Sequence, residues 1–397
     1  MVLKGISVLD LTRVVAGPAC TRTLADYGAE VWKIEPPTGD LMRLGIPKAN
    51  GVALTFAQQN AGKRHLCVDL SQSAGQALVL ELASKADVVV ENYRPGVAAR
   101  LGLGYEAIKT GNADIIYCSI SGYGQTGSAR HRRAYAPVIH AELGLVHLNA
   151  RERETKPLPE SVSHADFAVG AQAASAVMGA LFRRERTGEG CSIDVSMAET
   201  MLATNEWSAV EINGGFGDEV SPFRPGKAAI VKLQDGNYVQ IPGNPASWIF
   251  GMAKALGKEA EIHAIGWLSP RDTQGKEKQV KATMQRWADE YQNAEEFEAA
   301  LDSARVPLGT VKALADIPTE TWAKERQVFI DIDVNGTPRK IPRSPVRFDN
   351  VPAGPSESPD RGAMPRGAHN RPTLQQVLGL NDTALDGLEA DGVLLYE

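Results

Sequence analysis

Asp166 supplies a carboxylate at the positive end of a predicted helix. It lies near the start of the segment 161–190, SVSHADFAVGAQAASAVMGALFRRERTGEG, which has the pattern of a single helix. Ser163 is a candidate N-cap with Asp166 three residues later, and a run rich in Ala and Gly leads to a basic turn and Gly188. Small side chains let a helix pack close to a neighbouring backbone, so we expect this helix to be buried. The pattern is typical of a capping-box acid, and it places the carboxylate of Asp166 where a helix N-terminus stabilises an anion.

A second motif resembles a dinucleotide fingerprint. Gly122, Gly124 and Gly127 match GxGxxG and follow an apolar run. The fingerprint also requires a helix that opens at once and a strand ending in an acid about 20 residues later. Here the following residues are polar and basic and end at Pro137, and no such strand follows. An NAD-dependent enzyme is therefore the weaker interpretation of this chain.

The segment 5–125 alternates apolar runs with helical stretches, and it is expected to position these groups. The runs are rich in Val and Ile: ISVLDL, AEVWKIE, RHLCVDL, ADVVVENY and DIIYCSIS. This βαβ pattern predicts a doubly wound parallel sheet of the α/β class, in which ligands bind beyond the carboxyl ends of the strands. The turns 12–18, 35–40 and 91–96 are therefore candidate ligand-binding segments.

Composition limits the functional classes. The chain has 397 residues, with 43% hydrophobic and 23% charged, which is typical of a globular protein of about two domains. A net charge of −6 argues against nucleic acid as a partner. No run approaches the ~20 apolar residues of a membrane span. The N-terminal apolar run is too short for a signal peptide, so we expect a cytoplasmic protein without a membrane partner.

The cysteines give no sign of a metal centre. They form neither a CxxC pair nor a Cys/His ligand pattern and lie far apart in the sequence, at Cys20, Cys67, Cys118 and Cys191. Each lies in or beside an apolar segment, so buried free thiols are expected. No metal ion is predicted.

The composition changes to Gly, Pro and charge at 213–228, which predicts a domain boundary there. Two hairpins are expected after it, with turns at Asp235-Gly236 and Asn335-Gly336. The segment 350–371 is rich in Pro, Gly and charge and is expected to be extended across another surface.

Motifs along nearly the whole chain resemble the class III CoA-transferase family, also called the CaiB/BaiF family. They occur in the family's order and include LKGISVLDLTRVVAGP, LADYGAEVWKIEPPTGDLMR, NAGKRHLCVDL, ADVVVENYRPGVAARLGLGYEAI, ADFAVGAQAASAVMGALFRRERTGEG and PRGAHNRPTLQQVLGL. The resemblance implies an interlocked homodimer. Each chain would have a large Rossmann-like domain at 1–220, a smaller α+β domain at 221–328 and a C-terminal segment at 329–397 that returns to the large domain.

The resemblance also implies an activity, which is CoA transfer from an acyl-CoA donor to a free carboxylic acid. Asp166 matches the family's nucleophile, which would carry an aspartyl-CoA thioester. CoA would be a substrate, and no cofactor is implied. The positions that match the family's CoA contacts are Val14, Val15, Arg43, Asn92, Tyr93, Arg94, Arg100, Arg133 and Tyr135. Lys63 and Arg64 lie in the family's NxxKR turn.

Two alternatives to transfer remain. The family's α-methylacyl-CoA racemases use a His and an Asp as bases, and this chain has Ala134-Tyr135-Ala136 where their Gly-His-Asp stretch would lie. A non-catalytic binder of CoA esters would need no carboxylate at Asp166. The basic run 131–133 favours a dicarboxylic acid as acceptor, whereas Gly243-Asn244-Pro245, in place of a glycine-rich loop, argues against oxalate.

Overall fold

The computed structural model describes residues 1–215, 228–355 and 362–397. The chain divides into two compact units. The larger one consists of residues 1–143, 160–205 and 320–397, and the smaller one of 144–159 and 206–319. The expected boundary at 220 lies outside the described residues. The chain re-enters the large unit at 320 instead of 329, and 144–159 belongs to the small unit, which the sequence did not indicate.

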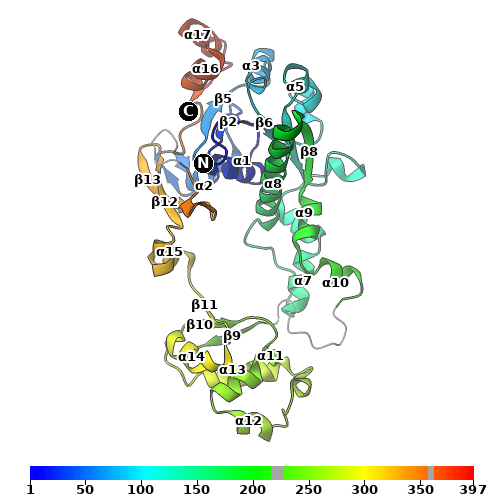
Figure 1. Ribbon diagram of the computed structural model, residues 1–397, viewed down its shortest axis with the longest axis vertical. Helices are drawn as coiled ribbons and strands as arrows, with labels where there is room; N and C mark the ends of the chain where they lie inside the picture. The colour runs from blue at the N-terminus through cyan, green and yellow to red at the C-terminus, as the bar shows by residue number, and fades with distance from the viewer. Residues whose placement is uncertain (216–227, 356–361) are drawn as a thin grey trace. The chain divides into compact units, whose positions relative to one another are not determined.

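A six-stranded parallel sheet forms the centre of the large unit (Figure 1). Its strands are β1 (Ser7–Asp10), β2 (Glu30–Glu35), β5 (Arg64–Cys67), β6 (Val88–Glu91), β7 (Ile116–Ser121) and β8 (Cys191–Ser196). Their order is β5-β2-β1-β6-β7-β8, which confirms the predicted parallel α/β sheet. The order reverses between β1 and β6, and a crevice beyond the carboxyl ends of such a pair is where doubly wound sheets bind ligands.

The expected helix around Asp166 is α8 (His164–Thr187), and it ends at Gly188, whose φ of 71° is left-handed. It packs on α1 (Ala16–Asp26). A Cβ added at Gly170 would lie 2.8 Å from the carbonyl oxygen of Ala16, so the close approach of the two helices requires glycine there. Only one face is buried, however, and Phe182 on the other face is 66% exposed.

Helix α8 is long and apolar enough to cross a membrane, although no apolar run of that length was expected from the sequence. Half of its most apolar window is buried inside the fold. A helix in the core of a globular unit can have the same length and composition, and α8 packs on α1 as such a helix does.

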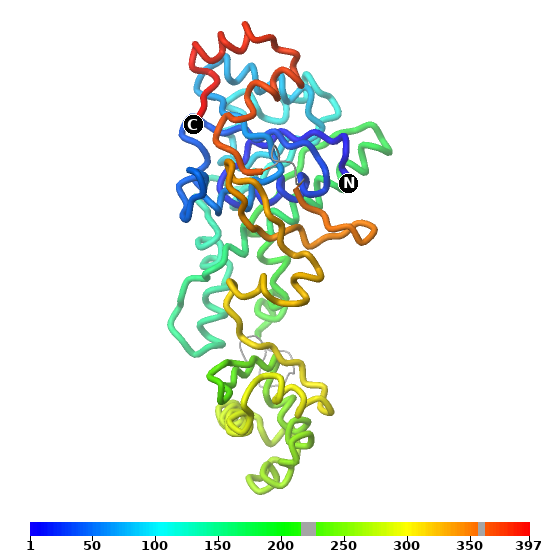
Figure 2. The backbone as a smooth tube through the Cα atoms, turned by 90° about the vertical axis from the view of Figure 1, so that its left-hand side faces the viewer, coloured from blue at the N-terminus to red at the C-terminus, as the bar shows by residue number. Residues whose placement is uncertain are grey.

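The C-terminal part of the chain completes the large unit. The hairpin of β12 (Phe329–Val334) and β13 (Thr337–Pro342) turns at Asn335-Gly336, as predicted, with both residues at positive φ. Helices α16 (Asn370–Leu378) and α17 (Asp382–Ala390) lie at the same end of the large unit as β5 and α3 (Ser73–Ala83) (Figure 2). Leu374 and Leu385 join the core there. The amide N–H of Cys67 donates to Oδ1 of Asn370 at 2.9 Å, which ties the chain end to the edge of the sheet.

The small unit is an α+β structure with its own core. The strands β9 (Ala229–Lys232), β10 (Tyr238–Ile241) and β11 (Gly309–Thr310) form an antiparallel sheet, and β9 and β10 flank the predicted turn at Asp235-Gly236. Trp267, Trp287 and Phe297 fill the core between this sheet and its helices. The helices are α7 (Leu145–Glu152), α10 (Ser208–Ile212), α11 (Pro245–Ala255), α12 (Glu259–Ala264), α13 (Glu277–Ala288) and α14 (Ala294–Leu301).

Shorter elements complete the large unit. The helices are α2 (Leu54–Asn60), α4 (Val97–Arg100), α5 (Tyr105–Gly111), α6 (Ala136–Glu142), α9 (Met197–Thr204) and α15 (Thr321–Glu325). The short strands pair as β3 (Lys48–Ala49) with β4 (Val52–Ala53) and β14 (Arg347–Phe348) with β15 (Val351–Pro352). After the GxGxxG glycines the chain forms only a 3₁₀ turn at Ser128–His131, so the helix of a dinucleotide fingerprint is missing.

Candidate active site

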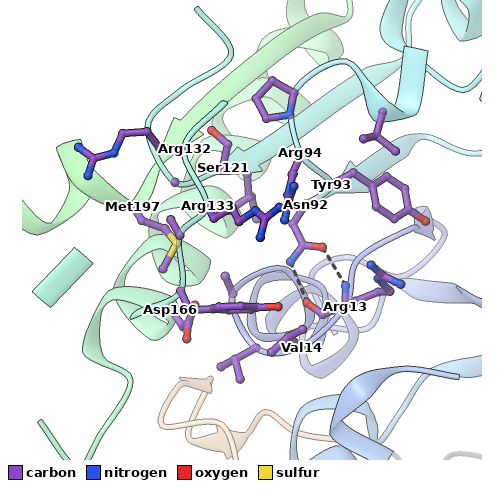
Figure 3. Close-up of a pocket in the computed structure, with 18 of the residues that line it drawn as sticks. Arg13, Val14, Asn92, Tyr93, Arg94, Ser121, Arg132, Arg133, Asp166 and Met197 are labelled. Carbon is purple, nitrogen blue, oxygen red and sulfur yellow. Dashed lines mark hydrogen bonds between the residues drawn. The ribbon is translucent and has the colours of Figure 1, made fainter. Parts of the chain in front are cut away.

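A pocket of about 550 Å³ opens at the carboxyl ends of β1, β6 and β7, at the reversal of strand order (Figure 3). Its walls are residues 13–16 after β1, 92–95 after β6 and 120–122 at the end of β7. Residues 132–135 and Asp166 also line it. All of these residues belong to the large unit. The topology therefore brings the predicted turns after β1 and β6 together with the predicted nucleophile.

The loop after β1 is held by hydrogen bonds on both sides. The side-chain amide of Asn92 accepts from the N–H of Arg13 and donates to its carbonyl oxygen, both at 2.8 Å (Figure 3). The N–H of Val14 donates to the carboxylate of Asp40 at 3.1 Å. Val14 has a φ of 70°, which is strained for a β-branched residue and persists only where the surroundings enforce it. The pocket wall contributed by β1 is therefore fixed.

A buried ionic network lies beneath this wall. The ammonium group of Lys63 is 3.0 Å from Asp10, and that of Lys33 is 3.1 Å from Asp40; all four side chains are fully buried. Burial alone would raise the pKa of Asp10, but the charges of Lys63 and Lys33 outweigh it and lower the pKa to about 2. Lys33 also donates to the carbonyl oxygen of Thr12 at 2.8 Å. The network thus connects the sheet to the strained loop, a role that the sequence did not reveal.

Asp166 enters the pocket from the first turn of α8. Its side chain has no hydrogen-bond or ion-pair partner within residues 1–215, 228–355 and 362–397, and the residue is 8% exposed. Burial raises the pKa of its carboxyl group to about 6. The hypothesis of a capping box is wrong, because Ser163 occupies the N-cap position without a side-chain hydrogen bond to the helix. Asp166 is therefore a poorly solvated carboxylate with its oxygens uncommitted.

Arginine side chains provide positive charge at the pocket, but they differ in their partners. Arg132 pairs with Glu142 and lies over the ring of Tyr123 at 5.1 Å. Arg94 and Arg133 line the pocket with no side-chain partner in the part of the chain that the structure describes (Figure 3). These two guanidinium groups are therefore available to an anionic ligand.

Two predicted contact residues do not line this pocket. Arg43 is buried, donates to both carboxylate oxygens of Glu35 at 2.6 Å and stacks on Phe56. Its charge is already neutralised, so we withdraw it from the candidate ligand contacts. Arg100 is exposed on α4, outside the lining, and its contact with a ligand stays a prediction.

The other predicted contact residues all line the pocket, and so do residues that the motifs did not indicate. The pocket is lined by Val14, Val15, Asn92, Tyr93, Arg94, Arg133, Tyr135 and Asp166. Arg13, Leu41 and Met197 also line it. Arg13 could have been predicted as a lining residue, because it directly precedes the predicted contact residue Val14. Met197 follows β8, and no sequence pattern indicated that it lines the pocket.

The chain is similar to known proteins over nearly its whole length. A family model described as CoA-transferase family III matches residues 3–370. The succinyl-CoA:glutarate CoA-transferase of Mus musculus is 32% identical over 403 residues, covering 99% of this chain and 90% of that protein. The succinyl-CoA–L-malate CoA-transferase beta subunit of Chloroflexus aurantiacus is 28% identical over 404 residues, covering 99% and 98%. The crystal structure of a CaiB/BaiF family protein from Brucella suis superposes with a TM-score of 0.77 at 29% identity, covering 94% of this chain and 99% of that one.

Proposed function

This chain belongs to CoA-transferase family III, and we propose that it transfers coenzyme A through a covalent intermediate on Asp166. The observation that carries the proposal is the carboxylate of Asp166, which lies in the pocket without a partner. An uncommitted carboxylate can act as a nucleophile towards a thioester. Binding alone would not require it, so a non-catalytic role in CoA binding is the weaker interpretation.

The proposed reaction has two symmetrical halves. A carboxylate oxygen of Asp166 attacks the thioester carbonyl of the donor, the C–S bond breaks and CoA leaves as the thiolate. The thiolate then attacks the aspartyl carbonyl of the mixed anhydride, which releases the donor acid as a carboxylate and leaves an aspartyl-CoA thioester. The acceptor carboxylate repeats these steps in reverse. No proton, metal or oxidant is consumed, because the thiolate released in the first step is the nucleophile of the second.

The pocket suits the charge of CoA. Arg94 and Arg133 are uncommitted, and guanidinium groups bind phosphate with paired, charge-assisted hydrogen bonds. The first turn of α1 also faces the pocket at Val15 and Ala16 and has no side-chain cap. Its free N–H groups favour a neighbouring anion. We assign Arg94 and these N–H groups to the phosphates of CoA and to charge that develops at the thioester, and we leave Arg133 for the acceptor.

A dicarboxylic acid is the acceptor that we propose. The curated relatives named above carry succinyl-CoA, glutarate or malate in their names. A second carboxylate on the acceptor needs a cation in the pocket besides those that hold phosphate, and Arg133 beside Tyr135 can supply it. We further propose that the enzyme works as an interlocked homodimer in the cytoplasm.

The racemase reaction finds less support. It requires a second base, and the position expected for its histidine is Tyr135. Ala136, where the racemases have their acid, is fully buried and has no titratable group. No histidine lines the pocket within the described residues.

The experiment that tests the function uses the purified full chain. Succinyl-CoA is incubated with equal amounts of glutarate, malate, oxalate and butyrate, and new CoA esters are identified by mass spectrometry. We expect esters of glutarate or malate at more than about ten times the rate of butyrate, because a charge-assisted hydrogen bond is worth about 1.5–3 kcal/mol. Butyrate is the matched control without the second carboxylate. Faster transfer to butyrate or oxalate would contradict the assignment of the acceptor.

The reaction should also depend on pH through Asp166. Because burial raises the pKa of Asp166 to about 6, the nucleophilic carboxylate is present above that pH and is lost below it. We expect kcat/KM to fall as the pH decreases through about 6, since kcat/KM reports the free enzyme. Phosphate monoesters also titrate near pH 6, so the rate alone is ambiguous. An infrared band of the protonated carboxyl group that titrates in the wild type and is absent in Asp166→Asn would assign the transition; a midpoint near 4 would contradict it.

A further inference from the structure

The helix that carries Asp166 does not cap its own N-terminus. Ser163 occupies the N-cap position with φ −79° and ψ 62°, and its hydroxyl makes no cap hydrogen bond. The N–H groups of the first turn of a helix need partners from outside the helix. A helix end without a cap frays more readily, and here it would take the proposed nucleophile with it.

A histidine from another helix supplies the missing partner. Nε2 of His140, on α6, accepts a hydrogen bond from the N–H of Ala165 at 3.0 Å. Ala165 directly precedes Asp166 in the first turn of α8. His140 is 1% exposed, so water does not compete for this bond. An Nε2 that accepts this bond belongs to a neutral imidazole with its proton on Nδ1, and Nδ1 is buried without a hydrogen-bond partner among the described residues.

We propose that His140 is a positioning residue for the nucleophile, which as a neutral imidazole caps α8 and fixes the first turn that holds Asp166. The proposal rests on the proposed function, because Asp166 must be the reacting group. His140 does not line the pocket and is assigned no contact with substrate. His140 acts on Asp166 through a single hydrogen bond, which it accepts from the backbone N–H of the neighbouring residue Ala165. A displacement of a reacting group by about 1 Å can reduce the rate ~100-fold, so a loosened first turn would slow the chemical step.

The surroundings keep His140 neutral. Burial and the nearby His164, whose ring lies 5.9 Å away, lower the pKa of His140, while Glu160 opposes this. Two carboxylates on the neighbouring helices already have partners. On α6 itself Glu142 is paired with Arg132. On α9, which packs against α6, Glu199 is bound to Ser196. An imidazolium would present a donor to the N–H of Ala165 and a positive charge to the positive end of α8.

Two amide substitutions separate positioning from packing. In His140→Gln the side-chain oxygen reaches about as far as Nε2 and can still accept from Ala165. His140→Asn has the same functional group on a shorter side chain, which cannot reach. We expect His140→Gln to retain most of kcat. His140→Asn should lose about tenfold in kcat, the effect of a lost cap. KM for acyl-CoA should stay within about twofold in both variants, because the residues that bind CoA are untouched.

Adduct formation on Asp166 separates the failure of this inference from the failure of the proposed function. Each protein is mixed with acyl-CoA without acceptor, and both the rate and the final stoichiometry of the covalent adduct are measured. His140→Asn should reach the wild-type stoichiometry more slowly; a lower stoichiometry at the wild-type rate would mean misfolded protein and would overturn the positioning role. Equal rates in the wild type and both variants would overturn it as well. If the wild type forms no adduct, the proposed function fails first.

Discussion

Replacing Asp166 by asparagine will abolish CoA transfer while the protein stays folded. The amide keeps the size of the side chain, but it is a poor nucleophile, and within the described residues no second carboxylate lines the pocket. We expect kcat to fall by more than about 10⁴-fold, the scale seen when a nucleophile is removed from an enzyme. Asp166→Ala should fall as far. Initial rates of CoA ester formation measure the loss.

The same substitution should not destabilise the protein. Because burial raises the pKa of Asp166 in the folded state above its unfolded value, the charged form opposes folding above pH 6. Removing that charge at pH 7 should raise the free energy of unfolding, by something on the order of 1–3 kcal/mol. A functional carboxylate that costs stability is a common compromise at active sites. Urea unfolding of the two proteins at pH 7 and at pH 5 gives the comparison, and the difference should shrink at pH 5.

Chemical trapping tests the covalent step directly. Wild-type protein mixed with acyl-CoA in the absence of acceptor should form an anhydride or thioester at Asp166 that hydroxylamine or borohydride captures. Peptide mapping should place the modification on Asp166, and the Asp166→Asn protein should remain unmodified. A racemase would behave differently: no adduct would be trapped, and the α-proton of a 2-methylacyl-CoA would exchange with heavy water. That pair of results would end the transferase mechanism on Asp166.

Replacing Lys63 by methionine will destabilise the large unit strongly. The ammonium group of Lys63 makes hydrogen bonds to Asp10, Thr21 and Asn60 at 3.0, 2.7 and 2.9 Å, and all are buried. Methionine fills similar space but leaves Asp10 charged, buried and short of a partner. Removing one member of a buried ion pair costs about 3–5 kcal/mol, and we expect a loss of that size in urea unfolding.

An exposed ion pair is the matched control for this prediction. Lys340 and Asp331 lie 3.1 Å apart, with side chains 49% and 63% exposed. Lys340→Met removes the same type of group and should change the free energy of unfolding by no more than about 1 kcal/mol. The double variant Asp10→Asn with Lys63→Met should recover part of the loss, since the uncompensated charge is then gone. Equal effects of Lys63→Met and Lys340→Met would refute the role assigned to the buried network.

The sequence determined the elements of the large unit and the residues at their ends. Strands and helices have short-range periodicity, which is why the five parallel strands between residues 5 and 125 and the hairpin turn at Asn335-Gly336 could be predicted. Parallel strands align their carboxyl ends, so the turns that contain Val14 and Arg94 could be expected to meet. Asp166 could be placed in the first turn of a helix because the signals of a helix start lie in consecutive residues. Its role as a nucleophile is what the family resemblance implies.

Only the tertiary structure decided what each of these side chains does. Arg43 and Lys63 have the sequence appearance of ligand-binding cations, but both are buried against Glu35 and Asp10, residues on other strands. Asp10 lies 53 residues from Lys63 in the chain. Glu35 is only 8 residues from Arg43, but Arg43 also donates to the carbonyl oxygen of Met364, 321 residues away. Local patterns do not encode such contacts. For the same reason the sequence indicated a self-capped helix at Asp166, while the fold left its carboxylate unpartnered, raised its pKa and assigned the cap to His140.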